Sequence, residues 1–179
     1  MDLDRKLVRD RYAGIFGAAV EPHFREFLSR SGSEGPTAVL GYARAGAEPL
    51  FLERYLDEPV ERLVGAAFGR PIARDQIVEL GNLAACNGWA LVRLWGEAAN
   101  DLGGAMEFAV ATLTAPLRDM FRRMGIPVMP LARATADRAG SAGWGDYYQT
   151  DPLVCAGRIA EGQAAILRFL AGRRARAAA

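Results

Sequence analysis

The stretch Ile77-Val78-Glu79-Leu80-Gly81-Asn82 decides the fold of this chain, because a strand pattern leads there into a helix start. Residues 74–80 alternate well enough between apolar and polar side chains to predict a strand. Asn87-Gly88 then opens a predicted helix in which large apolar residues recur until Leu102-Gly103-Gly104 ends it. The sequence therefore predicts a strand, a short connection and a helix, with Glu79 near the end of the strand.

Similar units follow towards the C-terminus. Residues 106–113 alternate in the manner of a strand, and Thr114 caps a predicted helix that Gly125 closes. Further strands are predicted over residues 126–131 and 153–159, before a last helix over residues 160–170. Right-handed crossovers would make the strands that begin near residues 74, 106 and 126 a largely parallel core.

The N-terminal part has a different pattern. Residues 3–17 have helical spacing, and residues 24–28 and 37–43 are short apolar runs separated by a turn, which predicts an antiparallel pair. A helix follows from Pro59 to Gly69, with Asp57 as its expected N-cap. We therefore predict a single-domain α/β fold, in which helices flank a mixed central sheet.

Length and composition limit the classes of function that the chain can have. The chain has 179 residues, a formal net charge of +1, two cysteines and one histidine. We expect one domain over residues 1–172 and a flexible, basic and alanine-rich tail over residues 173–179. No global charge would attract nucleic acid or a membrane, and no cysteine and histidine spacing predicts a metal site. Without a signal peptide or an apolar span, we expect a cytoplasmic protein.

Three stretches resemble the thermostable hemolysin family of bacterial proteins, which is grouped in fold with GNAT acetyltransferases and acyl-homoserine-lactone synthases. In chain order they are Leu50-Phe51-Leu52-Glu53-Arg54-Tyr55-Leu56-Asp57, Ile77-Val78-Glu79-Leu80-Gly81-Asn82-Leu83-Ala84 and, followed by Pro152, Trp144-Gly145-Asp146-Tyr147-Tyr148. The resemblance implies a GNAT-like fold and an acyltransferase activity.

The lactone synthases are similar at two places. Residues 79–84 resemble their Glu-x-Ser-Arg-Phe strand end, and residues 112–125 resemble a helix that begins after a threonine and ends in glycine. Gly81 and Asn82 stand where those enzymes carry Ser and Arg, which argues against S-adenosylmethionine as a substrate. The GNAT pyrophosphate loop is also absent, since residues 83–88 supply one glycine.

In a GNAT-like fold, the strand that carries Glu79 splays from its neighbour and an acyl thioester lies in the notch. The resemblance therefore implies acyl-CoA or acyl-carrier protein as donor substrate, with no tightly bound cofactor. Asn82, Leu83 and Ala84 are expected to border the donor. Backbone N–H groups near Asn87 and Gly88 could receive a phosphate, because a helix N-terminus favours an anion.

Glu79 is the predicted general base, which takes a proton from the attacking amine directly or through one water. The alternative is a carboxylate at the strand end that pairs with Arg74 or with another arginine. Asn82 could orient a carbonyl group or only hydrogen-bond within the turn. Cys86, near a helix N-terminus, could form a covalent acyl-enzyme or be a small buried residue.

The remaining site predictions are mostly aromatic. Tyr147 or Tyr148 could protonate the departing thiolate, although neighbouring aromatic residues can also pack as a lid. Further residues are expected to line the acyl pocket or shape the acceptor pocket, or to have structural roles instead: Trp144, Thr114, Arg54 and Tyr55.

The predicted function is an N-acyltransferase that moves an acyl group from a thioester to a small amine in bacterial specialised metabolism. A GNAT-like binding module without turnover and a membrane-active hemolysin are the alternatives. The hemolysin would need a long apolar segment or a strongly amphipathic basic helix, and the sequence displays neither. By analogy with the fold, an exposed sheet edge could pair in a homodimer.

Overall fold

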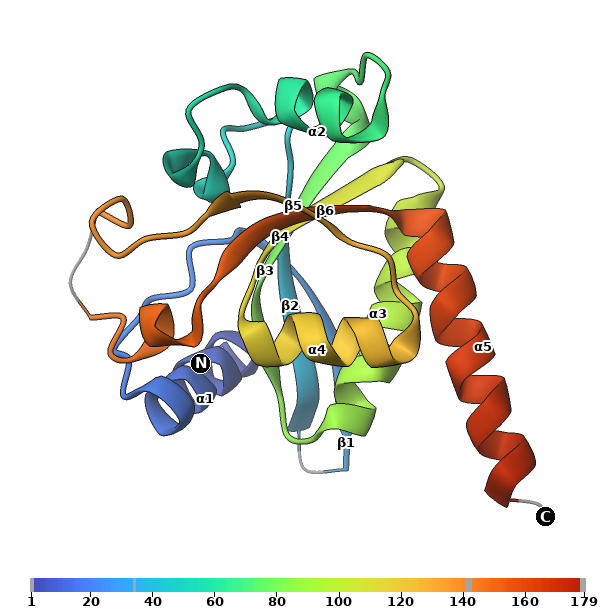
Figure 1. Cartoon of the computed structure of the whole chain (residues 1–179). Coiled ribbons are helices and arrows are strands. Elements are labelled where there is room, and N and C mark those ends of the chain that lie inside the picture. The colour runs from blue at the N-terminus through green and yellow to red at the C-terminus, as the bar shows by residue number, and fades with distance from the viewer. Residues whose placement is uncertain (1, 34, 141–142, 178–179) are drawn as a thin grey trace.

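The strand that carries Glu79, β3 (Ile77–Ala85), lies inside a six-stranded mixed sheet. The computed structural model describes residues 2–33, 35–140 and 143–177 (Figure 1). Strands β3 and β4 run parallel, and the other neighbouring pairs are antiparallel. The strand order is β1 (Glu26–Gly32), β2 (Gly35–Arg44), β3, β4 (Phe108–Leu113), β6 (Leu153–Arg158) and β5 (Met129–Arg133). The predicted α/β class with a mixed central sheet is confirmed.

One predicted strand neighbour is wrong. We expected the strand near residue 126 to join the parallel core, but β6 lies between β4 and β5 and is antiparallel to both. The reason is burial. Val154, Cys155 and Ala156 of β6 are almost fully buried, whereas the residues of β5 are exposed or half-buried. The more apolar strand therefore occupies the interior position and β5 takes the sheet edge.

The N-terminal half follows the prediction with two local differences. Helix α1 (Leu3–Phe16) ends at Gly17, and β1 and β2 form the expected hairpin. A short 3-10 helix, η1 (Phe51–Tyr55), precedes α2 (Val60–Phe68). The expected N-cap Asp57 is wrong, because Pro59 holds that position and Asp57 pairs with Arg138 at 2.9 Å. Strand β3 begins three residues later than expected, after η2 (Arg74–Gln76).

The helices of the C-terminal half begin where predicted. Asn87 caps α3 (Gly88–Gly103) by accepting a hydrogen bond from the Ala90 N–H at 2.9 Å. Thr114 occupies the N-cap position of α4 (Ala115–Met124), although its side chain makes no capping hydrogen bond. The η3 turn (Tyr147–Thr150) precedes β6.

The last helix, α5 (Ile159–Ala177), is longer than expected and projects from the sheet (Figure 1). It therefore contains most of the segment predicted as a flexible tail, and residues 178–179 lie outside the described part of the chain. The division into a domain and a tail stays a prediction. Within the residues that the structure describes, no helix is long and apolar enough to cross a membrane.

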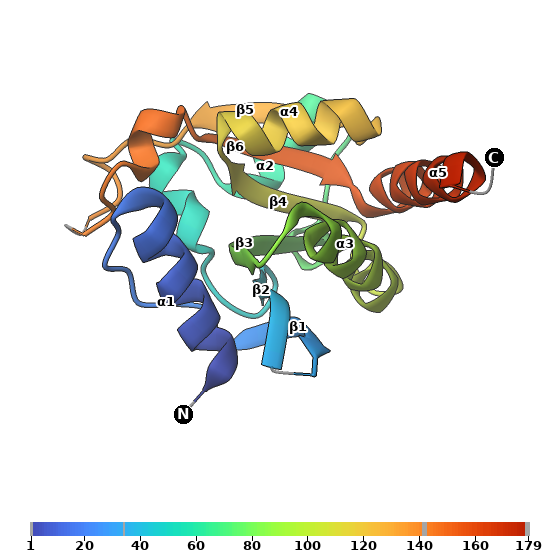
Figure 2. The same cartoon turned by 90° about the horizontal axis from the view of Figure 1, so that it is seen from below.

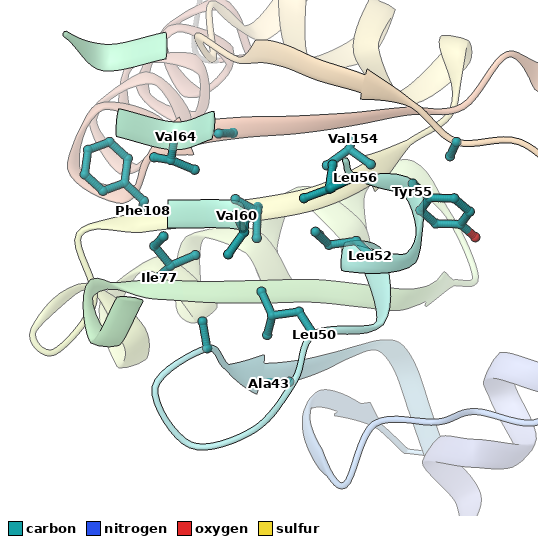
Figure 3. Packing of buried hydrophobic residues seen from close by; sticks show 14 of the residues in the cluster. Ala43, Leu50, Leu52, Tyr55, Leu56, Val60, Val64, Ile77, Phe108 and Val154 are labelled. Atoms are coloured by element: carbon teal, nitrogen blue, oxygen red, sulfur yellow. The ribbon is translucent and has the colours of Figure 1, made fainter. Parts of the chain in front are cut away.

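Helices cover both faces of the sheet. Residues of η1 and α2 pack on Ile77, Phe108 and Val154, and their side chains point towards the strands (Figure 3). Helices α3, α4 and α5 pack on the other face, around Leu40 of β2. Figure 2 shows α1 and α3 on either side of β3. Burial of each Val, Leu or Phe side chain in these layers contributes about 1.5–3 kcal/mol.

Packing explains why a glycine stands at position 81. It lies opposite Gly41 in the β2–β3 ladder, and the ring of Phe24 covers both glycines. A Cβ atom added to Gly81 would lie 2.6 Å from Phe24 Cε2, and one added to Gly41 would lie 2.7 Å from Phe24 Cδ2. The pair of glycines therefore admits an aromatic side chain flat against the backbone of the sheet.

Candidate functional site

Strand β3 separates from β4 near its end. The parallel ladder runs from Ile77 and Phe108 to Leu80 and Ala111, and β3 then continues to Ala85 without a partner residue in β4. Its register with β2 shifts by one residue in the same region, so that Asn82 and Leu83 together oppose Leu40. Asn82 has a positive φ of 44°, as one residue of a β-bulge can. The bulge turns β3 away from β4 and opens the sheet.

A cavity of about 420 Å³ occupies this opening. Its walls are mostly apolar and come from both separated strands and from α1, α3, α4, α5 and β6. Gly81, Leu83 and Ala84 border it from β3, and Ala111 and Thr112 border it from β4. One end extends between α3 and α5, and the other reaches residues of α1 and η3 on the opposite face of the sheet. The cavity therefore passes through the sheet at the gap between β3 and β4.

Glu79 lies on the face of the sheet that η1 covers and does not line this cavity. Its side chain is 3% exposed, and its two oxygens accept hydrogen bonds from the backbone N–H groups of Phe51 and Leu52, at 2.7 and 3.1 Å. Burial raises the pKa of Glu79 to about 8, and the two N–H donors oppose that rise. A carboxyl group with such a pKa can exchange a proton near neutral pH.

The pairing of Glu79 with Arg74, one of the alternatives for this residue, is wrong. Arg74 binds two other carboxylates, Glu53 at 2.6 Å and Glu61 at 2.9 Å. Arg74 precedes β3, and its Nε also donates to the Ala45 carbonyl oxygen at 2.8 Å, which directs the guanidinium towards η1 and α2. Backbone N–H groups, and not Arg74, therefore bind the two oxygens of Glu79.

Four of the five tyrosines gather near Glu79 and the cavity. The hydroxyl groups of Tyr55 and Tyr148 are 2.6 Å apart, and the Tyr147 ring stacks on Tyr12 with centroids at 6.2 Å. Burial raises the pKa of all four; the value for Tyr12 is about 12. At neutral pH these phenols are protonated, so each can donate a hydrogen bond.

Asn82 ties the bulge to the segment that precedes β1. Its side-chain oxygen accepts a hydrogen bond from the His23 N–H at 3.2 Å, and its amide group also hydrogen-bonds to Tyr12. The side chain is 4% exposed and does not line the cavity. Asn82 therefore holds α1 and the approach to β1 against the bulge, and a role in orienting a substrate carbonyl stays a prediction.

A second, smaller pocket of about 260 Å³ lies on the Glu79 side of the sheet. Ala43, which opposes Glu79 in the β2–β3 ladder, and Phe51, whose N–H binds Glu79, both line it. Arg54 also lines this pocket, with its guanidinium 3.7 Å from the Phe51 ring centroid. Its side chain donates to the carbonyl oxygens of Phe51 and Ala139, and its charge also acts on Glu79. Arg25 and Glu48 of the same lining pair with each other at 4.0 Å, so Arg54 leaves the lining with an excess of positive charge.

The predicted site residues fall into two groups. Those that line the large cavity are Leu83, Ala84, Asn87, Gly88, Thr114 and Tyr147. Those that do not line it are Glu79, Asn82, Arg54, Tyr55, Trp144 and Tyr148. Cys86 is an exposed thiol outside the lining of both pockets. The structure thus brings the predicted residues to two sides of one sheet segment, and their catalytic and binding roles stay predictions.

Several cavity residues had no signal in the sequence that pointed to a site. Tyr12 and Phe16 of α1 and Trp95 of α3 line the cavity, but their helical spacing predicts only a buried helix face. Ala98, on the same face of α3 as Trp95, gives no chemical signal either. Only their position around the gap in the sheet makes them part of a site.

Residues 3–163 match the profile of the family described as thermostable hemolysin. The chain belongs to this family. The resemblance found from the sequence is therefore confirmed. No curated protein matches the sequence.

Solved structures of this fold include acyl-transferring synthases. FeeM, an N-acyl amino acid synthase from uncultured soil microbes, has a TM-score of 0.63 and 14% identity, over 91% of this chain and 92% of FeeM. BjaI, a CoA-dependent acyl-homoserine lactone synthase, has a TM-score of 0.62 and 13% identity, over 94% and 81% of the two chains. LasI, an acyl-homoserine lactone synthase, has a TM-score of 0.58 and 14% identity, over 92% of this chain and 83% of LasI. The hemolysin-family chain therefore has the fold of these synthases.

Proposed function

We propose that this thermostable hemolysin family protein is an N-acyltransferase, which moves an acyl group from a thioester to a small amine. The observation that carries the proposal is the apolar cavity that crosses the sheet beside the strand bearing Glu79. A mostly apolar cavity of about 420 Å³ suits an acyl chain and a pantetheine arm. The likeness of the fold to FeeM, LasI and BjaI supports the same reaction class.

The amine would occupy the second pocket. Ala43 and Phe51 bring that pocket next to Glu79, and its charge at Arg54 favours an amine that also carries an anionic group. The amine nitrogen attacks the thioester carbonyl carbon, a C–N bond forms and the C–S bond breaks. Glu79 takes the proton that the nitrogen loses, directly or through one water, and the thiolate gains a proton as it leaves. The products are an amide and a free thiol.

The Gly81–Asn82 segment lies between the two pockets. Gly81 lines the large cavity, while Phe24, which covers Gly81 on the other face, lines the smaller pocket. The Phe24 ring or its neighbours must therefore move before the amine can reach the thioester. Tyr147, on the cavity wall, is our candidate to protonate the thiolate. The Tyr148 ring packs against Tyr147 with centroids 5.2 Å apart and supports it from behind, while its hydroxyl group hydrogen-bonds to Tyr55.

The direct test is release of free thiol. Purified protein is incubated with acyl-CoA or acyl-carrier donors and a panel of amines that includes amino acids, and thiol and amide products are followed together. We expect release that depends on both substrates. Absence of release, together with no thermal shift with any donor, would contradict the proposal.

A binding module without turnover is the second candidate. It is favoured by the position of Glu79, which is buried, held by two backbone N–H groups and absent from the cavity wall. In that case a donor would still stabilise the protein against heat, but no thiol would be released with any amine.

A further inference from the structure

Arg11 is an unpaired cation on the wall of the large cavity. It lies on α1, and its Nε atom is buried without a hydrogen-bond partner. The residues three and four positions away on the helix carry no acidic group: Leu7, Val8, Gly14 and Ile15. A helix surface can pair charges only at such spacings, so α1 itself supplies no counter-charge.

The other cations of α1 behave differently. Arg5 pairs with Asp2 at 3.1 Å, Lys6 pairs with Asp10, and Arg9 pairs with Glu21 at 3.1 Å. Arg11 has no such partner in the part of the chain that the structure describes. Arg11 is half-buried, and its Nε has lost its hydration without gaining a hydrogen bond from the protein. An anion bound in the cavity would supply that partner.

A second cavity-lining arginine shows the contrast. The Nε atom of Arg158 is also buried without a hydrogen bond, but its guanidinium lies 3.6 Å from Glu161 and over the rings of Phe68 and Phe108. Arg158 is therefore already compensated by one carboxylate and two aromatic faces. In the described part of the chain, Arg11 is the cavity-lining cation that has neither a carboxylate partner nor an aromatic face beside it.

The two ends of the cavity differ in uncompensated charge, because each end carries one arginine and only Arg158 has a carboxylate partner in the described structure. Arg11 belongs to the end where α1 packs on Ala84, four residues before Gly88 at the start of α3. The positive end of the α3 dipole adds to the potential there. The other end, between α3 and α5, is lined mostly by apolar side chains that include Trp95, Leu102 and Ile166. Arg158 and Gln163 also line it, but Glu161 balances the charge of Arg158. An amphiphilic ligand would therefore place its anion near Arg11 and its tail near Trp95.

We infer that Arg11 binds the phosphate of the phosphopantetheine arm of the acyl donor. The inference rests on the proposed function and deepens it by setting the direction in which the donor lies. CoA and carrier proteins share this phosphate, so both can use the contact. With the phosphate at Arg11, the thioester comes to the gap beside Gly81 and the acyl tail enters the space between α3 and α5.

The test combines a variant with a truncated donor. Arg11→Gln is compared with Arg9→Gln, a substitution on the same helix of a residue that does not line the cavity. Each is assayed with an acyl-CoA and with the N-acetylcysteamine thioester of the same acyl group, which lacks the phosphate. We expect Arg11→Gln to lower kcat/KM for acyl-CoA at least about 10-fold, as the loss of a charge-assisted hydrogen bond does. Its kcat/KM for the truncated donor should equal that of the wild type.

Equal losses with both donors, or no loss with either, would overturn the role of Arg11. A carrier-protein donor as a third substrate should follow acyl-CoA, because it contains the same phosphate. Arg11→Lys should recover part of the loss, and it replaces Arg11→Gln if the latter fails to fold.

A binding titration separates this inference from the proposed function. Wild-type protein is titrated with phosphopantetheine and with pantetheine, and binding is followed by NMR shifts without any turnover. We expect tighter binding of the phosphorylated compound, and loss of that preference in Arg11→Gln but not in Arg9→Gln. If no donor is turned over, the acyltransferase proposal fails while this titration still decides the role of Arg11. Equal binding of the two compounds would overturn it.

Discussion

The two faces of β3 have different surroundings, although the residues that form them alternate along one strand. On the side of α3, Leu80 borders an open, mostly apolar cavity. On the side of η1, Glu79 is packed closely and held by two backbone N–H groups. An alternating strand thus separates a space for an apolar ligand from a buried group that can hold a proton. The bulge at Asn82 is where the two sides meet.

The first prediction tests whether the two sides cooperate. Glu79→Gln should lower turnover at least about 100-fold, because a general base contributes about 10²- to 10⁴-fold. Donor binding, measured by thermal shift, should survive because Glu79 does not line the cavity. Glu58→Gln, at an exposed position outside both pockets, is the control for a lost carboxylate. Equal loss of binding and turnover would give Glu79 a structural role instead.

The second prediction tests the packing of Phe24 on Gly81, which separates the two pockets. Gly81→Ala should lower the free energy of unfolding by about 1–3 kcal/mol, because the new Cβ would overlap the Phe24 ring. Urea unfolding measures this. Gly14→Ala is the matched control, since a Cβ there meets nothing within 4 Å, and it should be neutral or stabilising by about 0.5–1 kcal/mol. An unchanged stability of Gly81→Ala would mean that Phe24 moves away at little cost.

The third prediction concerns pH. Because the pKa of Glu79 is raised to about 8 in the folded protein, the folded state holds this proton more tightly than the unfolded state. The contribution to stability is fully present below the ordinary carboxyl pKa and is lost as pH rises towards about 8. Turnover should rise over the upper part of this range, as the carboxylate forms. Both dependences, measured by unfolding and by rate profiles, should be absent in Glu79→Gln.

The fourth prediction concerns only the large cavity and tests where the acyl tail lies in it. Ala98→Leu fills space between α3 and α5, so it should lower turnover of long acyl donors and leave short donors unaffected. The expected loss is about 10-fold, which is the effect of losing one or two methylene contacts in an apolar pocket. Competition between donors of different length measures this preference. Ala171→Leu, at an exposed position of α5, serves as the control. A uniform loss over all chain lengths would place the acyl tail elsewhere.

The smallest effect is expected at the tyrosine pair. Tyr148→Phe removes the 2.6 Å hydrogen bond with Tyr55 and should cost about 1 kcal/mol of stability. If Tyr148 acts only behind Tyr147, turnover should fall less in Tyr148→Phe than in Tyr147→Phe. The reverse order would make Tyr148 the group nearest the thiolate.

Much of the local structure could be predicted because it depends on neighbours in sequence. The αL glycines Gly17, Gly69 and Gly125 end helices where the pattern predicted, and Asn87 caps α3. The order of strands could not be predicted, because it depends on how β6 is buried between β4 and β5.

The sequence by itself determined the α/β class, the family and the importance of the segment around Glu79, since these lie in periodicity and in contiguous motifs. Only the tertiary structure decided which side of the sheet each residue serves. A bulge at Asn82 separates β3 from β4, and the packing of Phe24 on two glycines divides the space into two pockets. Both effects arise from contacts between residues far apart in the chain, where no local pattern records them.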